Sequence, residues 1–298
     1  MKPLARLMLP AASAWLGACA AVEPDGARVA DARVTEASGI AASPGRPELL
    51  WMLNDSGGAP ELHLIEPTGA ARGTLRVEGV RNVDWEDLAS FRWRGRAWLL
   101  VGDIGDNAAI RKTVRLHLVA EPPLPETGRL MATVRPEWTL EFRYQDGPRD
   151  CEGLAVDVAQ ESILLLSKRD RPPRLYRLPL ASPADGVAVA TLLGEAVSPA
   201  PPPGAWPHPF GHQPTALDIA PDGRSAALAT YLGAYRIDRA PHESWAEAFA
   251  REPRLLARHG LAQAEALAFR RDGRSVVLSS EGAHPPLVVL PAAPTPSP

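Results

Sequence analysis

Short apolar strands separated by turns recur along the chain in pairs of one form. The first strand of each pair begins with polar residues and continues with apolar ones, while the second is apolar almost throughout. Because alternate side chains of a strand share one face, each first strand presents its polar start and apolar body on the same side. The pattern predicts five β-hairpins. The first strands are EASGIAA from Glu36, DWEDLAS from Asp84, DCEGLAV from Asp150, QPTALDI from Gln213 and QAEALAF from Gln263.

Two polar positions repeat in all five first strands. The first holds an acid or amide, and the second, two residues later, holds a hydroxyl or a carboxylate. The end of the second strand follows the second polar position after 16 or 17 residues in every hairpin, which indicates internal repeats. The first position holds Glu36, Asp84, Asp150, Gln213 and Gln263, and the second holds Ser38, Glu86, Glu152, Thr215 and Glu265.

Repeats of about four strands every 40 to 50 residues are typical of β-propeller blades. The last repeat contains only three strands and ends at PPLVVLP, whereas ARVADARV before Glu36 offers a fourth. We therefore predict an all-β chain with a single β-propeller of five blades over residues 26–291, closed by an N-terminal strand that completes the last blade. A sixth, degenerate blade in WTLEFRYQ or in the proline-rich stretch 199–209 is the alternative. Residues 292–298 are expected to form a disordered, proline-rich tail.

The N-terminus has the pattern of an export signal. Lys2 and Arg6 precede an apolar run that is too short to span a bilayer. The run ends in Leu-Gly-Ala-Cys at 16–19, which resembles a bacterial lipobox. The resemblance implies a signal peptide at 1–18, lipidation of Cys19, a linker at 19–25, and a location on the periplasmic face of a bacterial membrane or on the cell surface, with the lipid as the only membrane anchor. An ordinary secretory peptide cut near Ala18 is the alternative.

Composition narrows the possible partners of the mature chain. Loss of residues 1–18 leaves 30 basic and 35 acidic side chains, a formal charge of −5. This acidic balance provides no positive electrostatic field that would attract nucleic acid. Cys151 is then the one thiol after Cys19, and we interpret it as a small buried hydrophobe.

The repeats predict a crowded, acidic mouth of the central channel. In a propeller the innermost strand starts at one mouth and the second strand returns to it, so the polar positions converge. Carboxylates in one narrow opening raise one another's pKa, and a cation relieves this repulsion. Oxygen ligands favour calcium, with magnesium second, over zinc. Neutralisation by Arg81, Arg149 and nearby amides without a metal is the alternative. The expected ligands are Ser38, Glu86, Glu152, Thr215 and Glu265, with Glu36, Asp84, Asp150, Gln213 and Gln263 as a second layer.

The loops after the second strands border the same mouth and hold the candidates for catalysis. Asp103 and Asp106 suit metal binding or water activation, and Lys168 and Arg169 suit contact with a phosphate ester. The tetrapeptide DSGG around Ser56 resembles a trypsin-like nucleophile motif, but the first histidine follows it in the chain, so we interpret it as a turn. The further mouth residues are Asn54, Asp55, Asn107, Tyr231 and Glu281.

Two resemblances follow from these motifs. NDSGG, DWEDLA, GDIGDN and EALAFRRDGRSVVLSSEG resemble, over nearly the whole mature chain, a group of secreted bacterial propeller proteins related to phytase-like or esterase-like propellers. The axial order Ser, Glu, Glu, Thr, Glu is similar to the calcium-holding set of five-bladed calcium-activated nucleotidases of the apyrase type, from which Thr215 departs. The second resemblance implies that the axial residues bind calcium.

Two functions remain open from the sequence. One is a calcium-dependent hydrolase of phosphoesters or nucleotides. The other is a non-catalytic propeller with structural calcium that binds a protein, a glycan or a small ligand. Catalysis needs a positioned base beside the metal, and no loop carries a recognisable catalytic signature. The stretch 199–212 is expected either to cap a ligand or to cover a gap between blades, and 242–253 to hold a short surface helix.

Overall fold

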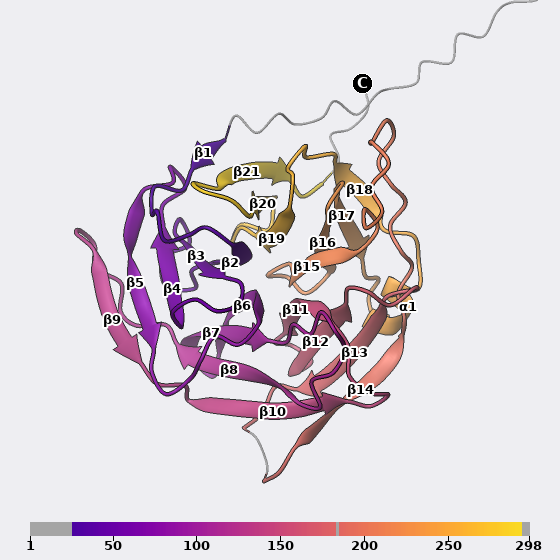
Figure 1. Cartoon of the computed structure of the whole chain (residues 1–298), viewed down its shortest axis with the longest axis horizontal. Coiled ribbons are helices and arrows are strands. Elements are labelled where there is room, and N and C mark those ends of the chain that lie inside the picture. The colour runs from indigo at the N-terminus through magenta and orange to yellow at the C-terminus, as the bar shows by residue number, and fades with distance from the viewer. Residues whose placement is uncertain (1–25, 183–184, 294–298) are drawn as a thin grey trace, which may run out of the picture.

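The sheets of the chain are arranged around a central axis, as Figure 1 shows in a view down the shortest dimension of the molecule. The computed structural model describes residues 26–182 and 185–293. The signal peptide, Cys19 and the linker expected at 1–25 lie outside this range, as do residues 294–298 of the expected tail. The architecture is that of an all-β propeller, and the one helix of the described residues spans five.

Four hydrogen-bonded sheets make up this architecture within the described residues. The first has the order β2-β3-β4-β5-β9, with β2 (Ala37–Ala42), β3 (Leu50–Asn54), β4 (Glu61–Ile65), β5 (Ala71–Val77) and β9 (Leu130–Val134). The largest has the order β11-β12-β13-β14-β10-β8-β7-β6, with β6 (Trp85–Trp93), β7 (Arg96–Asp103), β8 (Val114–Ala120), β10 (Trp138–Tyr144), β11 (Cys151–Asp157), β12 (Ser162–Ser167), β13 (Arg174–Pro179) and β14 (Ala188–Glu195).

The two remaining sheets have four strands each. One contains β15 (Pro214–Ile219), β16 (Ser225–Thr230), β17 (Ala234–Asp238) and β18 (Arg254–Ala257). The other contains β19 (Ala264–Phe269), β20 (Ser275–Ser280), β21 (Pro286–Pro291) and β1 (Ala27–Arg28). Antiparallel pairing of β1 with β21 confirms that N-terminal residues complete the last sheet.

The five predicted hairpins are confirmed, and their first strands surround the axis. β2, β6, β11, β15 and β19 lie around the centre in Figure 1, and each pairs antiparallel with the strand that follows it. Five clusters of buried apolar side chains fill the spaces between neighbouring repeats. Cys151 belongs to one of these clusters, as its interpretation as a buried hydrophobe requires.

Two parallel pairings connect neighbouring repeats at the rim. β9 lies beside β5, and β10 pairs with β14 over Phe142 to Tyr144. The segment WTLEFRYQ, considered above for a sixth blade, forms β10, which pairs antiparallel with β8. The stretch 199–212 contains no strand. The pairing of β10 with β14 is the reason that two repeats form one eight-stranded sheet.

Helix α1 (Trp245–Phe249) lies between β17 and β18, within the stretch expected to be helical. Ser244 and Glu247 form a capping box that satisfies N–H groups at its start. The Trp245 indole is buried and donates a hydrogen bond to Asp157 Oδ2 at 2.8 Å. The helix is therefore held against the repeats by the burial of Trp245 and by its hydrogen bond to Asp157.

Asp87, on the innermost strand β6, links three inner strands. Its carboxylate is fully buried and accepts the backbone N–H groups of Leu88 at 2.8 Å, Leu154 at 2.8 Å and Leu217 at 3.2 Å. Leu154 belongs to β11 and Leu217 to β15. Burial raises the pKa of Asp87 well above its usual value, against the effect of these three donors. The Asp87 carboxylate takes the place of the water that these three buried N–H groups would otherwise need as an acceptor.

We expect Asp87→Asn to lower the free energy of unfolding by about 2 to 3 kcal/mol, because one side of the amide would present N–H to an N–H donor. Urea denaturation of the variant and the wild-type chain measures this change. Asp272→Asn is the matched control, since exposed Asp272 accepts only the N–H of Arg274 among the described residues. Equal losses in both variants would contradict the role of Asp87.

Candidate functional site

The second polar position of each repeat coincides with an irregularity of its inner strand. The register with the second strand shifts at Ser38, Glu86, Glu152, Thr215 and Glu265. Such β-bulges redirect a side chain and are common beside functional sites. All five residues are buried, with at most 5% of their surface exposed. The repeated position seen in the sequence is therefore a repeated backbone feature.

A buried ammonium group lies among these residues. Lys168 Nζ is in contact with Glu152 Oε1 and lies 3.3 Å from Glu265 Oε1. Burial would lower the pKa of Lys168, but the two carboxylates outweigh it and raise the pKa above its usual value. Tyr231 donates to the same Glu265 oxygen at 2.7 Å. One side of the channel mouth is thus compensated by an internal cation.

The two hydroxyl residues connect neighbouring inner strands. Ser38 Oγ donates to the main-chain oxygen of Glu86 at 2.6 Å and lies 3.1 Å from Glu86 Oε2. Thr215 Oγ1 donates to the main-chain oxygen of Ala264 at 2.6 Å. Both hydroxyls use their hydrogen within the protein, and their lone pairs remain as possible ligands.

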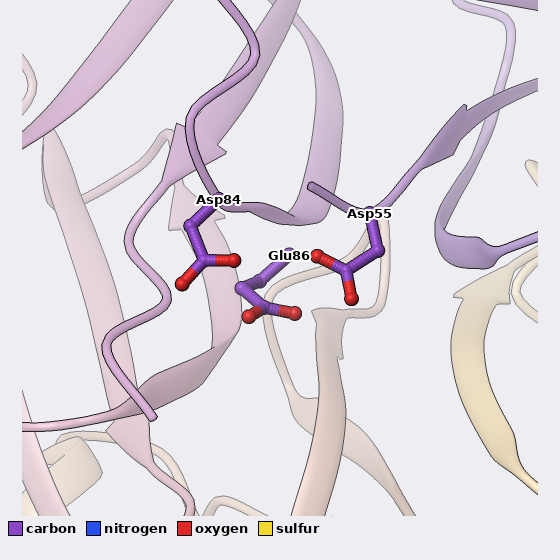
Figure 2. Close-up of side chains that lie close together, drawn as sticks. All are labelled: Asp55, Asp84 and Glu86. Carbon is purple, nitrogen blue, oxygen red and sulfur yellow. The ribbon is translucent and has the colours of Figure 1, made fainter. Parts of the chain in front are cut away.

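A group of three carboxylates lies at the same mouth. Figure 2 shows Glu86 between Asp84 and Asp55. One oxygen from each residue lies within 4.8 Å of the other two. A Cβ at Gly105 would overlap Glu86 Oε1 and Asp84 Oδ2, so any other residue in the loop after β7 would force the two carboxylates to move. We call Asp55, Asp84 and Glu86 the acid cluster.

The acid cluster binds protons more tightly than isolated carboxylates do. Burial, followed by the charge of Asp55, raises the pKa of Asp84 to about 6. Burial and the charge of Glu152 raise the pKa of Glu86 well above its usual value, and burial also raises that of Asp55. Raised pKa values in a concave site are typical of functional sites. A positive charge placed among these groups would be stabilised.

Glu152 connects the acid cluster to Lys168. Glu86, Asp150 and Glu152 form a second group with oxygens within 4.8 Å of one another. Glu152 is 3% exposed, and its Oε2 has no hydrogen-bond partner among the described residues. An unpaired buried oxygen of this kind is costly unless it binds a proton or a cation.

The acid cluster and its neighbours have the donor set of a calcium site. Every candidate ligand atom is a carboxylate or hydroxyl oxygen, which hard cations prefer. Asp55, Asp84 and Glu86 can supply up to six oxygens, within the six to eight that calcium takes with water. These residues fit calcium, which would supply the positive charge that the cluster lacks.

The other predicted residues of the second layer and the mouth loops divide into buried and exposed groups. Asp150 and Gln213 are buried, whereas Glu36 and Gln263 are exposed. Asn54 accepts the N–H groups of residues 35 and 36 and so shapes the loop. Glu281 accepts from Gln263, and burial together with Glu265 raises its pKa to about 8. The structure therefore brings only part of the predicted second layer to the axis.

The four candidates for catalysis all contact other groups of the chain. Asp103 forms an ion pair with Arg111 at 2.6 Å. Asp106 accepts the N–H groups of Ile110 and Arg111, which holds the loop after β7. Arg169 donates to Asp150 at 2.6 Å and also contacts Asn107. Lys168 pairs with Glu152 and Glu265. All four candidates therefore help to hold the structure of the mouth.

The stretch 199–212 contributes aromatic side chains beside Tyr231. The ring of His208 lies 5.3 Å from that of Tyr231 and 6.1 Å from that of Phe210, centre to centre. Trp206 is 81% exposed. The stretch therefore meets the mouth through His208, while Trp206 remains on the surface.

Two buried residues between the first and second repeats were not singled out from the sequence. His117 on β8 is 2% exposed, and burial lowers its pKa to about 4. Its Nε2 and the Nε1 of Trp85 have no hydrogen-bond partner among the described residues. A polar residue in the apolar strand VRLHLVA was the available signal, but strand alternation does not reveal a missing partner.

Comparisons with known proteins do not assign the chain to a family. No family model matches the chain, and no curated protein matches it. One similar solved structure is the hydrazine synthase of Kuenenia stuttgartiensis, with 8% identity over 87% of this chain and 72% of that chain and a TM-score of 0.42. Another is a gluconolactonase of Xanthomonas campestris, with 12% identity over 82% of this chain and 68% of that chain and a TM-score of 0.40. Similarity of this degree carries no inference about function.

We expect His117 to make the protein less stable as the pH falls from about 7 to 4.5. The unfolded chain binds a proton near pH 6.5, whereas folded His117 stays neutral until about pH 4, so stability is complete above 6.5 and falls below it. Urea denaturation at several pH values should show about 2 kcal/mol less loss in His117→Asn than in the wild-type chain. His242→Asn, at an exposed position, serves as the control, and equal pH dependence in all three proteins would refute the expectation.

Proposed function

We propose that this chain is an exported propeller of five blades whose acidic channel mouth binds a calcium ion. The ion would be held by Asp55, Asp84 and Glu86, with Glu152 and the hydroxyl of Ser38 beside them. The observation that carries the proposal is the acid cluster, whose three carboxylates converge within 4.8 Å without a cation of the described chain between them. Lys168 takes the place that a metal would otherwise fill between Glu152 and Glu265.

Five blades are supported by five inner strands and five apolar clusters between repeats. The count depends on treating the eight-stranded sheet as two blades joined at β10 and β14. Each half has an inner strand that begins at the channel mouth, and the β10–β14 connection is parallel, unlike the pairings within each half. This division also agrees with the resemblance of the axial residues to those of five-bladed calcium-activated nucleotidases.

The reaction that such a site suits best is hydrolysis of a phosphoester or nucleotide. A bound calcium ion would polarise a phosphoryl oxygen and bind the attacking water. Arg111 and Arg169 lie on the loops of the same mouth and offer N–H donors toward a phosphate, in addition to their present contacts.

A non-catalytic role is the second candidate, and one observation favours it. Asp103, Asp106, Lys168 and Arg169 are all engaged within the protein. In that case calcium would reinforce the mouth, and a protein, glycan or small ligand would bind over it. Magnesium is the less favoured ion in either role, because three converging carboxylates suit the larger and more flexible calcium shell.

Export and lipid anchoring belong to the same proposal and rest on the sequence. The residues concerned, Cys19 among them, lie outside the described part of the chain. No helix in residues 26–182 and 185–293 is long and apolar enough to cross a bilayer. A lipid on Cys19 would then be the attachment, at the periplasmic face of a bacterial membrane or on the cell surface.

Calcium should raise the melting temperature of the chain lacking residues 1–19 by several degrees, since saturation at one hundred times Kd stabilises the folded state by about 2.7 kcal/mol. Magnesium should have a smaller effect. Hydrolysis of p-nitrophenyl phosphate and ATP is assayed in the same samples. Calcium stabilisation with turnover supports the hydrolase, and stabilisation without turnover supports the binding role.

The double variant Asp84→Asn with Glu86→Gln separates the acid cluster from general effects of charge. It should lose the calcium response and melt at a higher temperature than wild type in EDTA, because the repulsion is relieved. Asp222→Asn with Glu126→Gln makes the same change of charge at exposed positions and should keep the response. A calcium response that survives in the first variant, or is missing in the wild-type chain, would overturn the proposed metal site.

Cys19→Ser should move the full-length protein from the membrane fraction to the periplasmic fraction of the expressing bacterium, because the lipid would be missing. Fractionation and immunoblotting of both proteins measure this. Cys151→Ser controls for loss of a thiol as such. Retention of Cys19→Ser in the membrane fraction would exclude the lipid anchor.

A further inference from the structure

A cavity lies at the end of the channel opposite the acidic mouth. Its volume is about 410 Å³, within the usual range for small-ligand pockets. The acidic mouth lies at the starts of the inner strands, whereas all five repeats line this cavity with residues at or just after the ends of the same strands. We call it the far cavity. Its lining comprises Pro44 and Pro47, residues 90–92, 156–159 and 219–223, and Arg271.

Arg271, which follows β19, connects its own repeat to the first two. Its Nη2 donates to the main-chain oxygens of Ala42 and Ser90, both at 2.8 Å, and lies 2.6 Å from Ser90 Oγ. Its Nη1 makes no hydrogen bond among the described residues and, unlike Nε, is not enclosed by protein atoms. The side chain is held in place through Nη2, and Nη1 offers a charged donor at the far cavity.

The guanidinium group of Arg271 is only partly compensated by acids. No ion pair of Arg271 is found in residues 26–182 and 185–293. Burial lowers the pKa of Arg271, and the charges of Asp218 and Glu121 offset this effect only in part, from beyond ion-pair distance. The two Asp218 oxygens already accept the N–H groups of Ile219 and Phe269, both at 2.8 Å. An anion beside Arg271 Nη1 would therefore be stabilised.

The acids of the cavity lining leave this place open. Asp157 Oδ2 lies 3.1 Å from Arg239 Nη1 and accepts the indole N–H of Trp245 at 2.8 Å. Asp222 is exposed and accepts a main-chain N–H two residues further along the chain. Arg92 is exposed in the lining, and no ion pair of Arg92 is found among the described residues. Because Arg239 neutralises Asp157, the lining presents two cations against one exposed acid.

Apolar side chains form much of the remaining wall. Each repeat except the last contributes at least one of them, so the apolar surface surrounds the cavity. A wall of this kind favours a ligand that buries apolar area. These side chains include Pro47, Phe91, Val156, Val158, Ile219 and Pro221.

We propose that the far cavity binds a small organic carboxylate with an apolar body. The carboxylate accepts a charge-assisted hydrogen bond from Arg271 Nη1, and the body contacts the apolar wall. An inorganic anion would leave the wall in contact with water, and a neutral apolar molecule would leave Arg271 without a counterion. The ligand therefore needs both parts. This site is separate from the acid cluster and does not depend on a metal.

Titration calorimetry with 4-phenylbutyrate in metal-free buffer tests the proposal independently of the calcium site. The wild-type chain without residues 1–19 should bind it saturably, and acetate or 4-phenylbutanol should bind at least about tenfold more weakly. Arg271→Gln should weaken binding of 4-phenylbutyrate at least about tenfold. Arg92→Glu should also weaken it, because it places a negative charge in the lining. Arg143→Glu makes the same change at an exposed strand position outside the lining and should bind like wild type.

Backbone amide ¹H–¹⁵N shifts provide a second readout, which locates the site. Saturating 4-phenylbutyrate should shift the signals of Val158 and Gly223 in the cavity lining and leave that of Gly105, beside the acid cluster, unchanged. Absence of saturable binding, equal affinity for 4-phenylbutanol, unchanged affinity in Arg271→Gln, or unchanged signals of Val158 and Gly223 would each overturn the proposal. If Arg271→Gln does not fold, wild-type affinity in Arg92→Glu would have the same consequence, since that position is exposed.

Discussion

Crowding of carboxylates at the channel mouth is the constraint on which the rest of this site depends. The five inner strands converge on the axis, and each presents a polar residue there at a β-bulge. Away from water, like charges at this spacing cannot all remain ionised. The ammonium group of Lys168 compensates the negative charges of Glu152 and Glu265. Asp55, Asp84 and Glu86 form no ion pair among the described residues; Lys168 and Arg111 act on them only from a greater distance, and their pKa values rise.

The difference between the paired and the unpaired carboxylates affects the stability of the folded chain. Acids that are held close together and kept partly protonated lower the stability of the folded chain at neutral pH. Rigid connections elsewhere along the axis offset such a cost. Asp87 binds N–H groups of three inner strands, and Thr215 joins β15 to β19. Destabilised groups held by a rigid frame are typical of ligand sites, where the ligand restores what the empty site lacks.

Strand β7 lies between β6, which carries Glu86, and β8, which carries His117. The last residue of this strand, Asp103, pairs with Arg111, and the loop after it passes beside the acid cluster through Gly105. Arg111, which follows the same loop, binds both Asp103 and the main-chain oxygen of Gly105.

The sequence by itself determined the hairpins, the inner position of their first strands and the closure by N-terminal residues. These features are local, since alternation and a constant spacing depend only on neighbours along the chain. It also identified the polar positions that meet at the axis. Only the tertiary structure decided which of them face one another. Lys168 pairs with Glu265, 97 residues away, and Asp55 and Asp84, assigned from sequence to a loop and a second layer, lie beside Glu86. Such partners depend on how neighbouring repeats are rotated and where their strands bulge, and neither property can be read from a repeat pattern. For the same reason the unpaired nitrogen of His117 was visible only once its surroundings were known.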